Sequence, residues 1–167
     1  DSDNLTVIDG VTNSTTTLNV GNQPRALAVN MVTNKIYLTN LSSDNVTVVD
    51  GVTHSTMTLT VGDAPCAVAV NPMTNKIYVA NYYSDNVTVI DGATNSRSAV
   101  AARTNPNAVA VNLATNKIYV ANWGSANVTI IDGATNSTNT VAVGNQPRAV
   151  ATNPVTNKIY VANFGSN

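Results

Sequence analysis

The sequence repeats itself every 41 residues, and this periodicity constrains the fold more than any other feature of the chain. The tetrapeptide Asn-Lys-Ile-Tyr recurs without insertion or deletion, beginning at Asn34, Asn75, Asn116 and Asn157. An Asp-Gly pair has the same period, beginning at Asp9, Asp50, Asp91 and Asp132. A strict period of this length is typical of architectures in which each copy is one supersecondary unit that packs on its neighbours. We therefore expect residues 1–167 to form a single domain of four units.

Each unit contains four segments with the properties of short β-strands. In the second unit, residues 66–71, 76–81 and 86–91 are mostly apolar and are separated by turn-forming residues. The fourth strand is clearest at residues 56–61, where apolar side chains alternate strictly with threonine. Alternation with a period of two indicates a strand with one solvated face, whereas continuous apolar runs indicate strands covered on both faces.

Four-stranded units of about 40–45 residues are typical of β-propeller blades. The first strand of each unit is expected to line a central channel, and the alternating strand is expected to form the outer edge. The composition agrees, because all nine acidic residues are Asp, which favours turns over helices. The predicted fold class is therefore all-β: a β-propeller built from four 41-residue, four-stranded blades per chain.

The chain has an offset start, because residues 4–9 form the third strand of a blade and residues 158–163 form a second strand. A clasp between these terminal strands would complete a blade and remove exposed edges. Two closures satisfy this requirement: a single-chain four-bladed ring, and a homodimer that exchanges N- and C-terminal strands to give an eight-bladed ring. The packing positions are Val, Ala, Ile and Leu, and aromatic residues make up 5% of the chain. Thin blades suit large rings, so we favour half of an eight-bladed ring.

The repeats resemble a known family. Tyr37-Leu38-Thr39-Asn40 and the three Tyr-Val-Ala-Asn segments, together with the flanking Val-Ile-Asp-Gly and Pro-x-Ala-Val-Ala-Val-Asn-Pro stretches, are similar to the YVTN-type β-propeller repeat. The resemblance covers the whole chain. It implies prokaryotic proteins of the surface-layer kind, extracellular or at the cell surface, and a distant kinship to propellers of periplasmic redox enzymes. It carries over no catalytic residue, because the repeat motif is structural.

Charge and hydropathy argue against several partners. The formal net charge is −1 and no basic stripe is present, so nucleic acid is not an expected ligand. No apolar run approaches 18 residues, so we expect no membrane insertion, and this chain shows no signal peptide.

The residues that could carry chemistry fit structural roles better. The repeated Asp of each Asp-Gly pair is expected to bond turn amides, and the lysines at the same end of the blade to form exposed charge pairs with it. Asp3, Asp44 and Asp85 are spread one per blade, which does not suit a metal site. His54 and Cys66 are the only residues of their types, and neither has a catalytic partner in sequence. We therefore expect no catalytic residue, no metal site and no cofactor.

Positions that vary between repeats are the better candidates for ligand binding. One set is mostly aromatic and follows the second strand, and the other is polar and precedes or begins the first strand. The candidates are Leu41, Tyr82, Tyr83, Trp123 and Phe164, with Gln23, Arg25, Gln146 and Arg148. Both sets should lie on the ring face opposite the Lys and Asp-Gly turns. Tyr, Trp and Arg contribute much of the energy at interfaces, although aromatic residues here would also fill gaps between blades.

The sequence therefore favours a non-catalytic binding or structural propeller module of an extracellular or cell-surface protein, with a protein, peptide or glycan as ligand. A fragment of a lactonase-like or periplasmic redox enzyme is the alternative. A repeat fragment without its own function, excised or designed, is the third interpretation.

Overall fold

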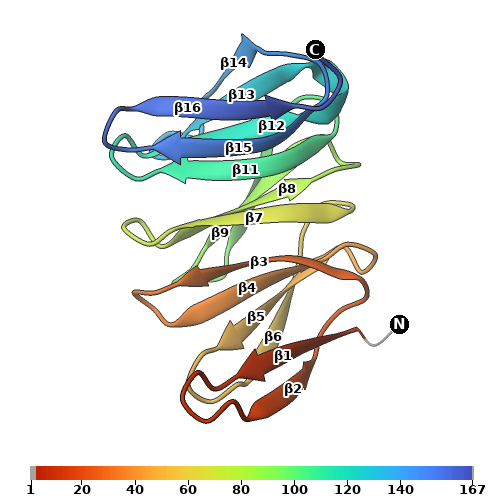
Figure 1. Ribbon diagram of the computed structural model, residues 1–167, viewed down its shortest axis with the longest axis vertical. Coiled ribbons are helices and arrows are strands. Elements are labelled where there is room, and N and C mark those ends of the chain that lie inside the picture. Colours follow the sequence, from red (N-terminus) through yellow and green to blue (C-terminus); the bar gives the residue numbers. More distant parts are fainter. Residues whose placement is uncertain (1–2, 167) are drawn as a thin grey trace.

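The computed structural model describes residues 3–166 and contains sixteen antiparallel strands, which form three four-stranded sheets and two two-stranded sheets (Figure 1). The first complete blade contains β3 (Pro24–Asn30), β4 (Lys35–Asn40), β5 (Asn45–Asp50) and β6 (Thr56–Thr60). The second contains β7 (Pro65–Asn71), β8 (Lys76–Asn81), β9 (Asn86–Asp91) and β10 (Arg97–Ala101). The third contains β11 (Pro106–Asn112), β12 (Lys117–Asn122), β13 (Asn127–Asp132) and β14 (Thr138–Ala142). The predicted all-β blade architecture is confirmed.

The terminal strands form half-blades. β1 (Asn4–Ile8) pairs with β2 (Thr15–Asn19), and β15 (Pro147–Asn153) pairs with β16 (Lys158–Asn163). These two hairpins lie at opposite ends of the stack of blades (Figure 1) and belong to separate sheets. A single-chain four-bladed ring would place β1 beside β16, and the described chain does not contain that pairing. One chain is therefore an open arc of three complete blades and two halves.

The Asp-Gly turns form because each repeated Asp bonds the backbone that follows it. Oδ1 of Asp50 accepts hydrogen bonds from the amides of Val52, at 2.9 Å, and Thr53, at 2.8 Å. His54 then reverses the chain with a φ of 58°, in the left-handed region that its Asn equivalents adopt more readily. Gly51 packs so closely on Asn34 that a β-carbon would clash with it. The Asp is therefore needed for the turn itself, and the Gly for its close approach to Asn34.

The hydrophobic core lies between blades. In the first layer, Tyr37, Val46 and Leu59 of one blade pack against Ile77 and Ile90 of the next. Tyr78 repeats this arrangement against Ile118 and Ile131 in a second layer. Each blade therefore buries an apolar face only because a neighbouring blade covers it.

Polar side chains join the same blades at the rim. The Asn at the end of each innermost strand donates to the Asn of the next blade's turn: Asn30 to Asn75 at 2.8 Å, and Asn71 to Asn116 at 2.8 Å. A lysine also crosses the boundary, as Nζ of Lys76 donates to the carbonyl of Gly133 at 2.7 Å. Lys35 makes the equivalent bond to the carbonyl of Gly92 at 3.5 Å, so these two lysines bond the next blade's turn backbone, where the sequence predicted charge pairs with Asp.

Among residues 3–166, no helix is long and apolar enough to cross a membrane. The one short helical turn in that range is η1, a 3-10 helix at Trp123–Ser125, which joins β12 to β13.

Candidate functional site

Each innermost strand begins with a β-bulge, and the bulged residue faces the candidate site. The pairing register shifts between Pro24 and Ala26, and the same shift recurs at the equivalent position of every innermost strand. A bulge leaves one residue out of the ladder and redirects its side chain. The four residues redirected in this way are Arg25, Cys66, Asn107 and Arg148.

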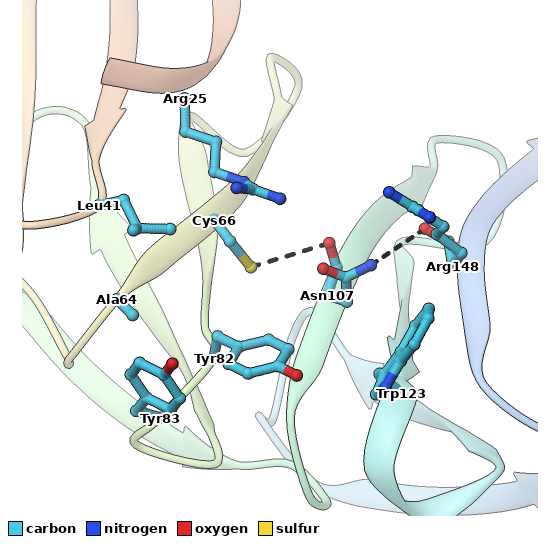
Figure 2. A pocket seen from close by; sticks show the side chains of 9 residues that line it. All are labelled: Arg25, Leu41, Ala64, Cys66, Tyr82, Tyr83, Asn107, Trp123 and Arg148. Carbon is cyan, nitrogen blue, oxygen red and sulfur yellow. Dashed lines mark hydrogen bonds between the residues drawn. The ribbon is translucent and has the colours of Figure 1, made fainter. Parts of the chain in front are cut away.

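These bulged residues line a hollow of about 360 Å³ that we call the mouth pocket (Figure 2). Its lining is Arg25, Leu41, Ala64, Cys66, Tyr82, Tyr83, Asn107, Trp123 and Arg148. In Figure 2 the guanidinium groups of Arg25 and Arg148 point into the hollow from opposite sides. The lining holds two cations and no carboxylate, so the pocket favours a ligand with negative charge.

Aromatic rings hold the Arg148 guanidinium in place. Its central carbon lies 5.9 Å from the ring centroid of Trp123 and 5.7 Å from that of Phe164. The two rings, which come from adjacent blades, are stacked with centroids 5.8 Å apart. Contacts of this length over a ring face are cation–π interactions. The stack thus fixes the position of one cation at the pocket wall, and it also packs one blade against the next.

On the other wall, Tyr82 and Tyr83 contact each other edge to face, with ring centroids 5.1 Å apart. Tyr83 is 73% exposed, so this ring covers little of the protein's own surface. Tyr82 is tied to the next blade, because its carbonyl accepts a hydrogen bond from Nδ2 of Asn105 at 3.1 Å. The pair presents an exposed aromatic surface on an anchored backbone.

Cys66 forms the floor between the two walls. Its Sγ donates to the carbonyl of Pro106 at 3.3 Å, and burial raises the pKa of its thiol to about 11, against a smaller opposing effect of Arg25. The thiol is therefore protonated at neutral pH and is a poor nucleophile.

The structure brings six of the nine predicted site residues into one pocket: Leu41, Tyr82, Tyr83, Trp123, Arg25 and Arg148. Phe164 joins them through its stack on Trp123. Gln146 lines a neighbouring shallow hollow with Trp123 and Gly124. Gln23 lies elsewhere, where its Oε1 accepts a hydrogen bond from Ser42 at 2.7 Å.

Sequence reasoning missed Ala64, Cys66 and Asn107 as members of the pocket. The signal was available for two of them, because Cys66 and Asn107 have the same repeat register as Arg25 and Arg148. The strand register puts the two ends of a blade apart, with the bulge at one end and the Lys and Asp-Gly turns at the other. Pro24 pairs with Asn40 at one end of the blade, whereas Lys35 pairs with Asp50 at the other.

The repeated acidic residues have structural partners. Backbone amides hold the pKa of Asp9, Asp50, Asp91 and Asp132 below its ordinary value. Asp3, Asp44 and Asp85 each accept a hydrogen bond from a backbone amide about twenty residues later, at 2.8–2.9 Å. Within residues 3–166, no three His, Cys, Asp or Glu side chains cluster as metal ligands would.

Comparisons with solved structures show the β-propeller fold. Over 89% of its length the chain matches hydrazine synthase from Kuenenia stuttgartiensis with a TM-score of 0.77 and 23% identity, covering 46% of that chain. It also matches a chain of the nidogen/laminin complex over 95% of its length, with a TM-score of 0.73 and 16% identity, covering 63% of that chain. The chain thus spans about half to two thirds of these structures. No protein-family model and no curated protein matches it.

Proposed function

We propose that the chain is a non-catalytic binding module that recognises an acidic segment of another protein through the mouth pocket. The observation that carries this proposal is the pairing of two inward-pointing arginines with exposed aromatic rings in a pocket without a carboxylate. Tyr, Trp and Arg are the residues that dominate protein–protein binding energy. We further propose that the chain is a YVTN-type propeller of a prokaryotic cell-surface or extracellular protein, which rests on the sequence resemblance.

The ligand chemistry follows from the arginines. A guanidinium offers parallel N–H donors that bind a carboxylate in a bidentate manner. The Trp123 and Phe164 rings hold the Arg148 guanidinium at the pocket wall, and we propose that its N–H groups donate to the ligand. The aromatic wall at Tyr82 and Tyr83 offers contact area for apolar side chains next to the acidic one. We therefore propose a peptide segment in which Asp or Glu lies beside an apolar residue.

Two other functions compete with this proposal. A fragment of a propeller enzyme would need a general base or a nucleophile at the mouth, and the raised pKa of Cys66 weakens the one candidate that the pocket offers. A repeat fragment without a function would leave the pocket without a ligand. The pocket's departure from the repeat, at the bulged residues and in the aromatic series, favours binding over this third interpretation.

The test is selection from a random dodecapeptide library displayed on phage, with the Arg148→Ala chain as the counter-selection. We expect selected peptides to be enriched in Asp and Glu and to lose at least about tenfold in affinity for Arg148→Ala, because a charge-assisted hydrogen bond contributes about 1.5–3 kcal/mol. Lys117→Ala, on the opposite face, is the matched control and should bind normally.

Selection of basic peptides, or equal binding by the wild-type and Arg148→Ala chains, would contradict the proposal. Binding on a glycan array in the absence of any peptide enrichment would assign the pocket to carbohydrate and would also reject it.

A further inference from the structure

We infer that a second copy of this chain closes the ring, so that each N-terminal half-blade completes the C-terminal half-blade of the other copy and gives eight blades. The evidence is a set of contacts that recur at every complete blade boundary and run out at the two ends of the chain. The first is the Asn ladder, in which Asn112 donates to Asn157 at 3.0 Å as its equivalents do in the preceding blades. Asn153 is the next donor in this series, and its acceptor would lie one repeat beyond Asn157. The equivalent residue of a second copy is Asn34.

The turn backbone gives an independent match. The amides of Gly51, Gly92 and Gly133 each donate to the carbonyl of the Asn just before the second strand of the same blade, at 2.8–2.9 Å. At these three glycines a β-carbon would clash with that Asn, whereas a β-carbon at Gly10 would meet nothing within 4 Å. The Asn that would pack on Gly10 is equivalent in the repeat to Asn157, which lies at the other end of the arc. Asn157 of a second copy would supply it.

Side chains on β16 fit β1 in the same register. Nδ2 of Asn40 donates to Oδ1 of Asn45 at 2.7 Å and to Oγ1 of Thr47 at 2.9 Å, and Asn81 and Asn122 repeat both bonds. Asn163 is the fourth member of this series. In the repeat, the acceptors Asn45 and Thr47 are equivalent to Asn4 and Thr6, and both of these residues lie on β1. Pairing β16 with β1 of a second copy would therefore give the Asn163 side chain its two acceptors and would also form the backbone hydrogen bonds between the two strands.

Apolar side chains that are buried in the complete blades are exposed at the two ends of the arc, where the half-blades of a second copy would cover them. Tyr160 is 56% exposed, although Tyr78 is fully buried in the same register. Ile8 is 64% exposed, although Ile90 is fully buried. Leu27 and Val29, on the inner part of the first complete blade, are also exposed, because no inner half-blade lies beside them. The N-terminal half-blade lacks the inner strands that the C-terminal half-blade possesses.

A second copy is the occupant that satisfies both ends at once. The two edges are complementary to each other, and a two-fold axis therefore closes both seams with identical contacts. Within one chain the two hairpins lie at opposite ends of the arc (Figure 1), so the chain does not pair them itself. Unpaired strand edges are aggregation-prone, and closure would pair the two edges, on β1 and β16, that end the arc.

Closure also completes the mouth of the channel. Neighbouring bulged residues are in contact across complete boundaries, as Nδ2 of Asn107 donates to the carbonyl of Arg148 at 3.4 Å. In an eight-bladed ring, the blade after the one that carries Arg148 would be the blade of the second copy that carries Arg25. Arg148 of one copy would therefore lie beside Arg25 of the second copy. The ring would then carry two arginine pairs on opposite sides of its mouth. The role of these arginine pairs in binding rests on the proposed function, whereas the inference that a second copy closes the ring does not.

The test is sedimentation equilibrium of the 167-residue chain, which needs no ligand and is therefore independent of the binding proposal. We expect a single species of twice the 17.3 kDa chain mass. Tyr160→Ala should raise the dimer dissociation constant by about 100-fold or more, because truncating a buried aromatic side chain is among the costliest core substitutions. Tyr83→Ala, an exposed tyrosine away from the seam, is the matched control and should remain a dimer.

Asn163→Ala, a milder change on the same strand β16, should raise the dissociation constant by about tenfold. Circular dichroism of each variant distinguishes a folded monomer from an unfolded chain. A folded 17.3 kDa monomer of the unmodified chain would overturn the inference. So would a ladder of larger masses, which would mean open end-to-end association in place of two-fold closure.

Discussion

The blade of β7 to β10 and the half-blades at the chain ends are made from the same repeat, yet they have different environments. Tyr78 is fully buried between two blades, and Tyr160 in the same register is 56% exposed. The side chain, the strand and the local turn are alike in both places. The difference is the neighbour, since β8 has a blade on each face and β16 has an unpaired edge. In this fold, a repeat motif specifies a blade and the adjacent blade supplies its core.

The largest effect should come from Tyr78→Ala, which removes a fully buried ring from the layer with Ile118 and Ile131. We expect a loss of about 3–5 kcal/mol in the free energy of unfolding. Tyr78→Phe is the control: the hydroxyl is buried with no hydrogen-bond partner in residues 3–166, so its removal should cost nothing or stabilise. Urea unfolding followed by circular dichroism measures both. Equal losses for the two variants would mean that the hydroxyl, and not the ring, matters.

The same tyrosine predicts sensitivity to alkali. Burial, with a smaller contribution from Asp132, raises the pKa of Tyr78 to about 12 from an ordinary value of 10. The folded state therefore holds this proton more tightly than the unfolded chain does. The stability that it contributes is complete below pH 10 and is lost as the pH rises from 10 to 12. Tyr78→Phe should flatten this part of the stability profile, and an unchanged profile would contradict the assignment.

The Asn ladder sharpens the comparison between the centre and the ends. Asn71 is buried, donates to Asn116, and also accepts from the amides of Met73 and Thr74. Asn71→Ala should cost about 1–3 kcal/mol, because it leaves buried polar groups without partners. Asn153→Ala should cost as much only if a second copy covers Asn153. Thermal unfolding of both variants at high and low protein concentration distinguishes the cases.

The smallest effect is a gain. Ala126 stands where Asp3, Asp44 and Asp85 accept an inter-blade hydrogen bond, and it has a left-handed φ of 51° that Asp adopts more readily than Ala. Ala126→Asp should restore the acceptor for the amide of Gln146 and raise the free energy of unfolding by about 1 kcal/mol. Ala126→Asn keeps the acceptor without the charge and is the control. A loss of stability in both variants would show that η1 requires Ala at this position.

The sequence predicted the blades well because their signals are local and repeated four times. Alternation, the Asp-Gly turns and the Tyr-Val-Ala-Asn strands placed nearly every strand within a residue of its observed end. The bulge was not predicted, because a register shift depends on how two strands pair and leaves no periodic signal. Cys66 and Asn107 share the repeat register of Arg25 and Arg148, but only the bulge shows that all four side chains turn toward the mouth pocket.

The arrangement of the half-blades could be predicted only as a choice between two closures. Both satisfy the offset of the repeat, and the difference between them is an angle that accumulates over four blade contacts. The structure adds that the terminal hairpins of one chain lie apart (Figure 1). It also identifies the side chains, Asn163 and Asn153 among them, that lack within residues 3–166 the partner that their equivalents have in the complete blades.

Hydrogen exchange of the backbone amides tests most directly whether the half-blades become the middle of a blade. If β16 of one copy pairs with β1 of the other, amides of β1 and β16 should be as protected as those of β8 and β9, with exchange through global opening. Protection in both should fall together on dilution, because it depends on association. Rapid exchange throughout β1 and β16 at high protein concentration, beside protected β8 and β9, would contradict closure by a second copy.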